Sequence, residues 1–258
     1  MLTVRRIYLY LVAAISLSVV AWSVIGLIRL ILSEGIGEGQ IIGLATLLAA
    51  IIVGLPIFLF HWLMAQRLTA RNVEEQGSII RRIYFVGLML VGAAPILSNL
   101  YRLVDDGLVL LLGGMQRDYY PYSLSVGEHV AAVLVWGVVW IYLWRQVEAD
   151  NRLLPTLETH LTIHRLYLLI LALAGLIMVT WGAVGLIQSL LQLPSGVTWR
   201  TPIADDMAQL LTGTAIWVGH WTLLQRAFLS GQPAEERSVL RKVYLYLAVF
   251  VYSVMAVF

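Results

Sequence analysis

The sequence contains no cysteine, which excludes disulfide bonds, thiolate metal ligands and cysteine nucleophiles. Charged residues make up only 12 %, against about 25 % in a typical soluble domain. No Asp, Glu or Lys falls near the centre of a long apolar run, where proton-coupled and ion-coupled transporters normally need one. There is also no glycine-rich phosphate loop and no Ser-His-Asp arrangement typical of hydrolases. We therefore expect neither active transport nor an enzyme.

What the sequence does contain is long apolar runs. Hydrophobic residues make up 60 % of the chain, and the mean hydropathy is +0.85. Several runs reach the ~18–20 residues that cross a hydrocarbon core, and runs such as Ile41–Phe60 are apolar on every face. Backbone groups in lipid must bond internally, which favours helices. The sequence predicts an all-α, polytopic transmembrane bundle of about seven spans: Arg6–Leu32, Ile41–Gln66, Arg82–Val104, Glu128–Val147, His164–Leu191, Ala204–Phe228 and Arg241–Phe258.

An internal repeat organises these spans. Gly54–Arg67 (GLPIFLFHWLMAQR) and Gly213–Arg226 (GTAIWVGHWTLLQR) align at an offset of 159 residues, and the alignment continues without gaps over about sixty residues. An Arg-x-Tyr or Lys-x-Tyr motif opens the odd-numbered spans. We predict parallel two-helix repeats at residues 1–80, 81–163 (diverged) and 164–239, with a single span of a fourth repeat at 240–258.

Lys and Arg gather at one set of span ends. Thirteen lie at the ends that include the N-terminus, and the opposite ends hold only Arg29, Arg102, Arg117 and Arg200. Because Lys and Arg are retained in the cytoplasm, the N-terminus is predicted to be cytoplasmic in a multi-pass protein of the cytoplasmic (inner) membrane. Arg29 is the one charge well inside a predicted span, and it lies close enough to the outer end to reach the interface.

Two histidines occupy equivalent positions in the repeat. His61 and His220 each lie six residues before an arginine that ends the span, about 9 Å below the charged rim. Facing each other, they would ligate haem b or a chlorin from both sides, with Trp62 and Trp221 packed against the ring. The simpler interpretation is that each His-Trp pair anchors its helix, with its N–H groups bonded to a neighbour. Our leading expectation is that no cofactor binds.

Two further polar groups are candidate sites. His160 and His164 share a helix face at metal-binding spacing, but no third ligand accompanies them, so we predict no metal site. The acidic pairs at 105–106 and 205–206 fall on the outer side, with Glu128 and His129. With Arg102 and Arg200 they would form an outer ion-binding or ion-pairing cluster, although carboxylates at helix starts also stabilise the helix dipole.

The motifs together resemble a known family. They are the Arg-x-Tyr-x-Tyr entrance (Arg6–Tyr10, Lys242–Tyr246), the His-Trp-x3-Gln-Arg exit (His61–Arg67, His220–Arg226) and a Glu-Glu link before the next entrance (Glu74-Glu75, Glu235-Glu236). The chain resembles an uncharacterised family of bacterial multi-pass membrane domains of unknown function. The resemblance implies a bacterial cytoplasmic-membrane location and repeated helix pairs, and it implies no activity.

Three functions remain open. The leading hypothesis is a non-enzymatic membrane module, a scaffold, sensor or assembly subunit, because packing signals abound. Its partners would be membrane lipid and other membrane subunits or further copies of the chain, and no nucleic acid. The second is a redox or pigment-binding protein that uses His61 and His220. The third is a channel or carrier for a neutral solute.

Overall fold

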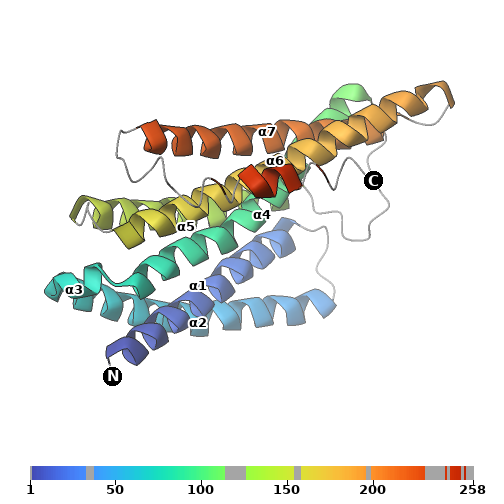
Figure 1. Ribbon diagram of the computed structural model, residues 1–258. Coiled ribbons are helices and arrows are strands. Elements are labelled where there is room, and N and C mark those ends of the chain that lie inside the picture. The colour runs from blue at the N-terminus through green and yellow to red at the C-terminus, as the bar shows by residue number, and fades with distance from the viewer. Residues whose placement is uncertain are drawn as a thin grey trace. The chain divides into compact units, whose positions relative to one another are not determined.

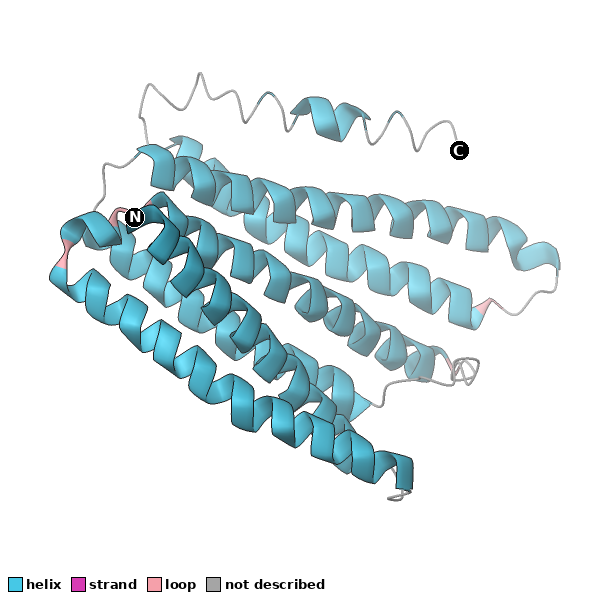
Figure 2. Cartoon of the chain, turned by 90° about the horizontal axis from the view of Figure 1, so that it is seen from below, coloured by secondary structure: helices cyan, strands magenta, loops and turns pink. Residues whose placement is uncertain are grey.

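The computed structural model describes residues 2–32, 38–113, 126–153, 158–195, 199–229, 242, 245–250 and 253. These residues form helices, and none of them is in a strand (Figure 2). The prediction of an all-α bundle is therefore confirmed. The elements are α1 (Leu2–Leu32), α2 (Glu38–Arg71), α3 (Val73–Gln76), α4 (Ile79–Leu112), α5 (Val126–Leu153), α6 (Glu158–Gln192), a 3-10 turn at Leu193–Ser195 and α7 (Arg200–Leu229).

Five helices in the described part of the chain are long and apolar enough to cross a membrane: α1, α2, α4, α5 and α6. The chain is thus a membrane-embedded, multi-pass protein. Helix α7 lies at the predicted sixth span but is not among the five, and its first turns carry Arg200, Asp205 and Asp206. The predicted span at 241–258 lies largely outside the described residues.

Several helices extend beyond the apolar runs that predicted them. Helix α4 continues past the predicted end at Val104 to Leu112. Helices α2 and α5 likewise run into charged segments, because Arg, Glu, Gln and Ala favour helix as strongly as Leu does. Gly113 ends α4 with φ of +64°, a left-handed conformation that glycine adopts without steric cost.

The chain forms two compact units (Figure 1). The first comprises residues 1–99 and 124–163, and therefore holds α1, α2, α3, the first part of α4, all of α5 and the start of α6. The second comprises residues 100–123 and 164–258, with the end of α4, most of α6 and α7.

Helix α1 organises the first unit. It packs along α2 and also contacts α5 (Figure 1). Glycine permits the approach of α2 at Gly54, where an added Cβ would lie 3.0 Å from Val20. The core of this unit is mostly apolar and holds side chains that are almost completely buried: Phe85, Met89, Trp136 and Leu143.

In the second unit, α6 and α7 pack even more closely. A Cβ added at Gly175 would lie 2.6 Å from the backbone nitrogen of Trp217, and one at Gly213 would lie 2.7 Å from that of Val179. The repeat equivalent of Gly175 is Ser16 in α1. The glycine therefore lets the second helix pair meet backbone to backbone, as small residues do in membrane helices.

Candidate functional site

His61 is held by two hydrogen bonds within the first unit. Its Nδ1 lies 2.8 Å from the carbonyl oxygen of Ile57, one turn earlier in α2. Because a carbonyl only accepts, Nδ1 carries the proton. Nε2 is then the acceptor for the hydroxyl of Tyr8 on α1, at 3.4 Å, and the two rings meet edge-on. The imidazole thus joins α1 to α2.

His220 repeats this arrangement in the second unit. Its Nδ1 lies 2.8 Å from the carbonyl oxygen of Ile216, and its ring meets Tyr167 of α6 edge-on at 6.3 Å between centroids. Each of these residues lies 159 positions after its counterpart in the first unit. The two helix pairs therefore share the same histidine–tyrosine geometry. In both, the hydrogen bond to the carbonyl oxygen places the proton on Nδ1 and so fixes the tautomer of the imidazole.

The two predicted tryptophans differ in their surroundings. Trp62 is buried, donates its Nε1–H to the Tyr142 hydroxyl at 2.8 Å and stacks on Tyr84. It therefore links α2 to α4 and α5. Trp221 is half-buried in α7. Because His61 and His220 belong to different units, the prediction that they face each other across a pigment stays a prediction.

The predicted histidine pair on α6 is only partly described. The side chain of His160 lies outside the described residues, whereas His164 stacks on Tyr167 with 6.4 Å between ring centroids. Among the residues that the structure describes, no three His, Asp or Glu side chains come together as metal ligands would.

The outer polar residues divide between the two units. In the first unit, Arg29 pairs with Glu128 at 3.7 Å, and Nδ1 of His129 lies 2.7 Å from Oδ1 of Asn99. The amide of Asn99 in turn donates to the carbonyl of Pro95 at 2.7 Å. Arg29, which was expected to reach the interface, also joins α1 to α5 through this ion pair.

In the second unit the acidic residues of α7 accept hydrogen bonds. The Tyr101 hydroxyl donates to Asp205, and the Ser189 hydroxyl donates to Asp206 at 2.7 Å. Arg200 donates to the carbonyl of Gly113 at 2.8 Å. These bonds connect α7 to α4 and α6. The sequence analysis considered ion binding, ion pairing or stabilisation of the helix start for this acidic pair, and did not include hydrogen bonds to neighbouring helices.

The sequence reasoning missed that some charges at one end of the first unit are buried, among them Arg81 and Arg82. Arg81 is 2 % exposed, and its guanidinium donates to both carboxylate oxygens of Asp150, at 2.8 and 3.3 Å. It also donates to Tyr10 at 3.3 Å and Thr69 at 3.2 Å, and it lies over the Phe85 ring. One guanidinium thus connects α1, α2, α4 and α5, because its donors diverge in a fixed fork.

A second ion pair ties the same end of the unit to α3. Glu75 is buried and accepts from Arg6 at 2.7 Å and from Arg5 at 3.3 Å. We call this the arginine-rich end, defined by Arg6, Arg81 and their acidic partners. The sequence analysis counted these arginines only as markers of orientation. The available signal was the presence of acidic residues among the arginines of these segments: Glu74, Glu75, Glu148 and Asp150.

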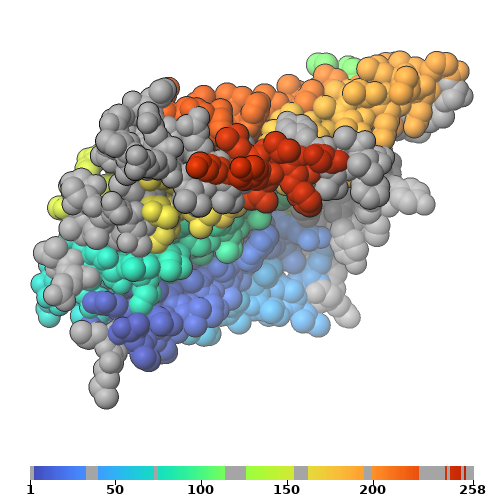
Figure 3. Space-filling model, viewed as in Figure 1, coloured from blue at the N-terminus to red at the C-terminus, as the bar shows by residue number. Residues whose placement is uncertain are grey.

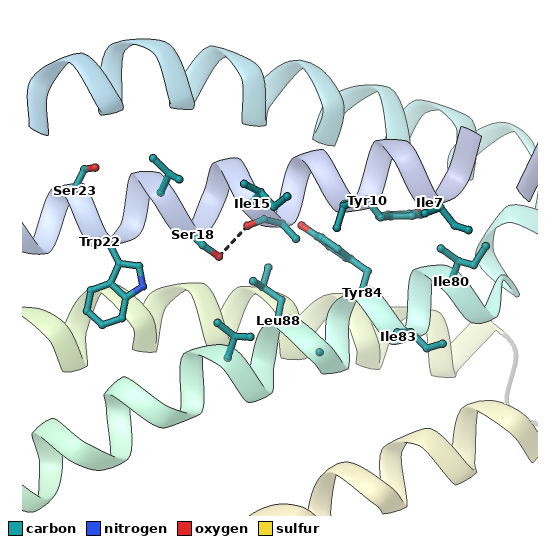
Figure 4. A pocket seen from close by; sticks show the side chains of 15 residues that line it. Ile7, Tyr10, Ile15, Ser18, Trp22, Ser23, Ile80, Ile83, Tyr84 and Leu88 are labelled. Carbon is teal, nitrogen blue, oxygen red and sulfur yellow. Dashed lines mark hydrogen bonds between the residues drawn. The ribbon is translucent and has the colours of Figure 1, made fainter. Parts of the chain in front are cut away.

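An apolar groove runs between α1 and α4 of the first unit (Figure 4). It encloses about 930 Å³, with Ile7 and Ile80 towards one end and Trp22 at the other. Small side chains of α1 and α4 line its length: Ala14, Ser18 and Gly87. In the surface view α1 and α4 lie next to each other on the face shown (Figure 3). The helix rises about 22 Å over the fifteen steps from Ile7 to Trp22, which is most of a ~30 Å hydrocarbon core.

A family model described as a domain of unknown function (DUF5671) matches residues 6–138 and 165–258. The two matched segments begin 159 residues apart, which is the spacing of the sequence repeat. The resemblance that the entrance and exit motifs indicated is therefore confirmed. No curated protein and no solved structure matches the chain.

Proposed function

We propose a function for this chain, which belongs to the family described as a domain of unknown function (DUF5671), and we base the proposal on the groove between α1 and α4 of the first unit. In this proposal the chain is a non-catalytic membrane module that assembles with another membrane protein. A transmembrane helix of the partner docks between α1 and α4.

The shape and lining of the groove support a helix as its occupant. Membrane helices associate where small residues allow backbones to approach, and the groove presents such residues along α1. At Gly87 an added Cβ would meet no atom within 4 Å, so the wall of α4 has space for a neighbouring backbone. Large apolar side chains at the rim are exposed, among them Ile15, Trp22 and Val91.

Site-directed photocrosslinking in native membranes tests this proposal. A benzoylphenylalanine at Ile15, in the groove, should form a covalent adduct with one discrete protein. The same group at Val138, which is 67 % exposed on α5, should not. Gly87→Leu fills the groove and should abolish the adduct, whereas Gly137→Leu, also in open space, should leave it intact. Adducts with lipid alone, or an adduct insensitive to Gly87→Leu, would refute helix docking.

A location follows from the same framework. We propose that the chain lies in a bacterial cytoplasmic membrane with its N-terminus and the arginine-rich end inside the cell. The excess of Lys and Arg at these ends supports this orientation.

Pigment binding is a second candidate because the histidine geometry recurs. In both helix pairs Nδ1–H is committed to a backbone carbonyl, the arrangement that fixes Nε2 as the ligand in many metal sites. At His61, iron would have to displace the Tyr8 hydroxyl from Nε2. A visible absorption band in the purified protein, lost in His61→Ala and in His220→Ala, would establish this function, and a colourless preparation that stays colourless with added haem would remove it.

The carrier hypothesis receives less support from the first unit. Its polar ends, around Arg81 and Glu128, are separated by the apolar core described above. Among the described residues of that unit, the large apolar side chains of Phe85, Trp136 and Leu143 fill the space between these ends.

A further inference from the structure

The arginines at the arginine-rich end fall into two groups. Arg6 and Arg81 are bonded to buried carboxylates, as described above. Arg67 and Arg71, near the end of α2, are exposed and make no hydrogen bond or ion pair with any residue that the structure describes. These two cations are therefore available to a ligand from outside the chain.

Helix geometry places both on the outer face of α2. Trp62 and Thr69 are buried and mark the inward face of this helix. At 3.6 residues per turn, Arg67 and Arg71 point away from that face, one turn apart. Phe60, which is 65 % exposed, lies on the same outer face two turns before Arg67. Only 6 % of the apolar span of α2 is buried, so this face meets the lipid.

The outer face is hollowed where the charges begin. A depression of about 490 Å³ is lined by Phe60, Leu63, Met64, Arg67, Leu68 and Arg71. Its floor is apolar on the membrane side, and two guanidinium groups stand at the other end. This arrangement of apolar and charged groups matches a phospholipid, whose acyl chains lie in the hydrocarbon core and whose phosphate lies at the interface.

We propose that this face of α2 binds an anionic phospholipid. The acyl chain lies along Phe60 and Met64, and the phosphate accepts hydrogen bonds from Arg67 and Arg71. Guanidinium is the group best suited to a phosphate because its planar fork matches two oxygens at once. A net negative headgroup is favoured over a zwitterionic one because the site presents two positive charges that have no partner among the described residues.

The second helix pair provides a comparison within the same chain. Arg226 is the repeat equivalent of Arg67 and is also exposed. The position equivalent to Arg71 is Ser230, and the position equivalent to Phe60 is Gly219. The second pair thus lacks one cation and the large apolar side chain, so the lipid site belongs to the first pair.

Fluorescence quenching by brominated lipid tests the site. Because the chain has no cysteine, Val53→Cys gives a single labelling position, on the same face of α2 and about 10 Å deeper than Phe60. The labelled full chain is reconstituted in phosphatidylcholine vesicles that contain brominated phosphatidylglycerol or, in equal proportion, brominated phosphatidylcholine. Phosphatidylglycerol should quench at lower concentration, and each of Arg67→Gln and Arg71→Gln should reduce this preference about fivefold.

Control variants make the result decisive. Arg226→Gln should leave the preference unchanged, and the double change Arg67→Lys/Arg71→Lys should retain most of it because the charge is kept. Both Gln substitutions replace exposed side chains without a described partner, so a native circular dichroism spectrum is expected. Equal quenching by the two lipids, a preference that survives both Gln substitutions, or an equal loss in Arg226→Gln would overturn the proposal.

Discussion

Removal of Asp150 should destabilise the first unit more than any surface change at the same end. Asp150→Ala takes away two hydrogen bonds and the countercharge of Arg81, which is 2 % exposed. The guanidinium retains only the neutral oxygens of Tyr10 and Thr69, at 3.3 and 3.2 Å. A buried ion that loses its partner typically costs about 3–5 kcal/mol, a large part of the ~5–15 kcal/mol that stabilises a folded domain.

The measurement is unfolding by sodium dodecyl sulfate in mixed micelles, followed by circular dichroism. Glu148→Ala is the matched control, since Glu148 pairs with Arg152 one turn along the exposed face of α5 and should contribute about 0.5 kcal/mol or less. The double variant Arg81→Met/Asp150→Leu should recover part of the loss because the buried charge of Arg81 is removed together with that of its partner, while Arg82, which is 1 % exposed, keeps its charge. If Asp150→Ala costs no more than Glu148→Ala, the network does not stabilise the fold as argued.

Three further predictions follow from packing and orientation. Trp136→Ala should cost about 3–5 kcal/mol in the same unfolding assay, because this side chain is completely buried, and Trp22→Ala, at 51 % exposed, should cost clearly less. Gly213→Ala should cost about 1–3 kcal/mol, since its Cβ would fall 2.7 Å from atoms of α6, and wild-type stability would show that the helices separate freely. In intact cells, a membrane-impermeant thiol reagent should label Leu193→Cys and should reach Asn72→Cys only after permeabilisation; the reverse pattern would invert the proposed orientation.

The architecture could be predicted from the sequence because lipid imposes few solutions on an apolar chain. Runs such as Ile41–Phe60 have to be helical, since each backbone group needs an internal partner. The offset of 159 residues predicted that two helix pairs would be alike. The Tyr8–His61 and Tyr167–His220 ring contacts are alike in the two pairs, so the similarity extends to side chains. Helix ends were less predictable, because α4 continues through Asp105 once that carboxylate is buried.

The sequence by itself therefore determined the class of protein, its helices and the family to which it belongs. Only the tertiary structure decided what each polar residue does. Arg81 and Arg67 look alike in the sequence, yet one is buried against Asp150 and the other is exposed on α2. The physical reason is that the apolar pattern of a helix can be read along that helix alone. The partner of a charged side chain lies on another helix, and it is decided by which helix faces pack together.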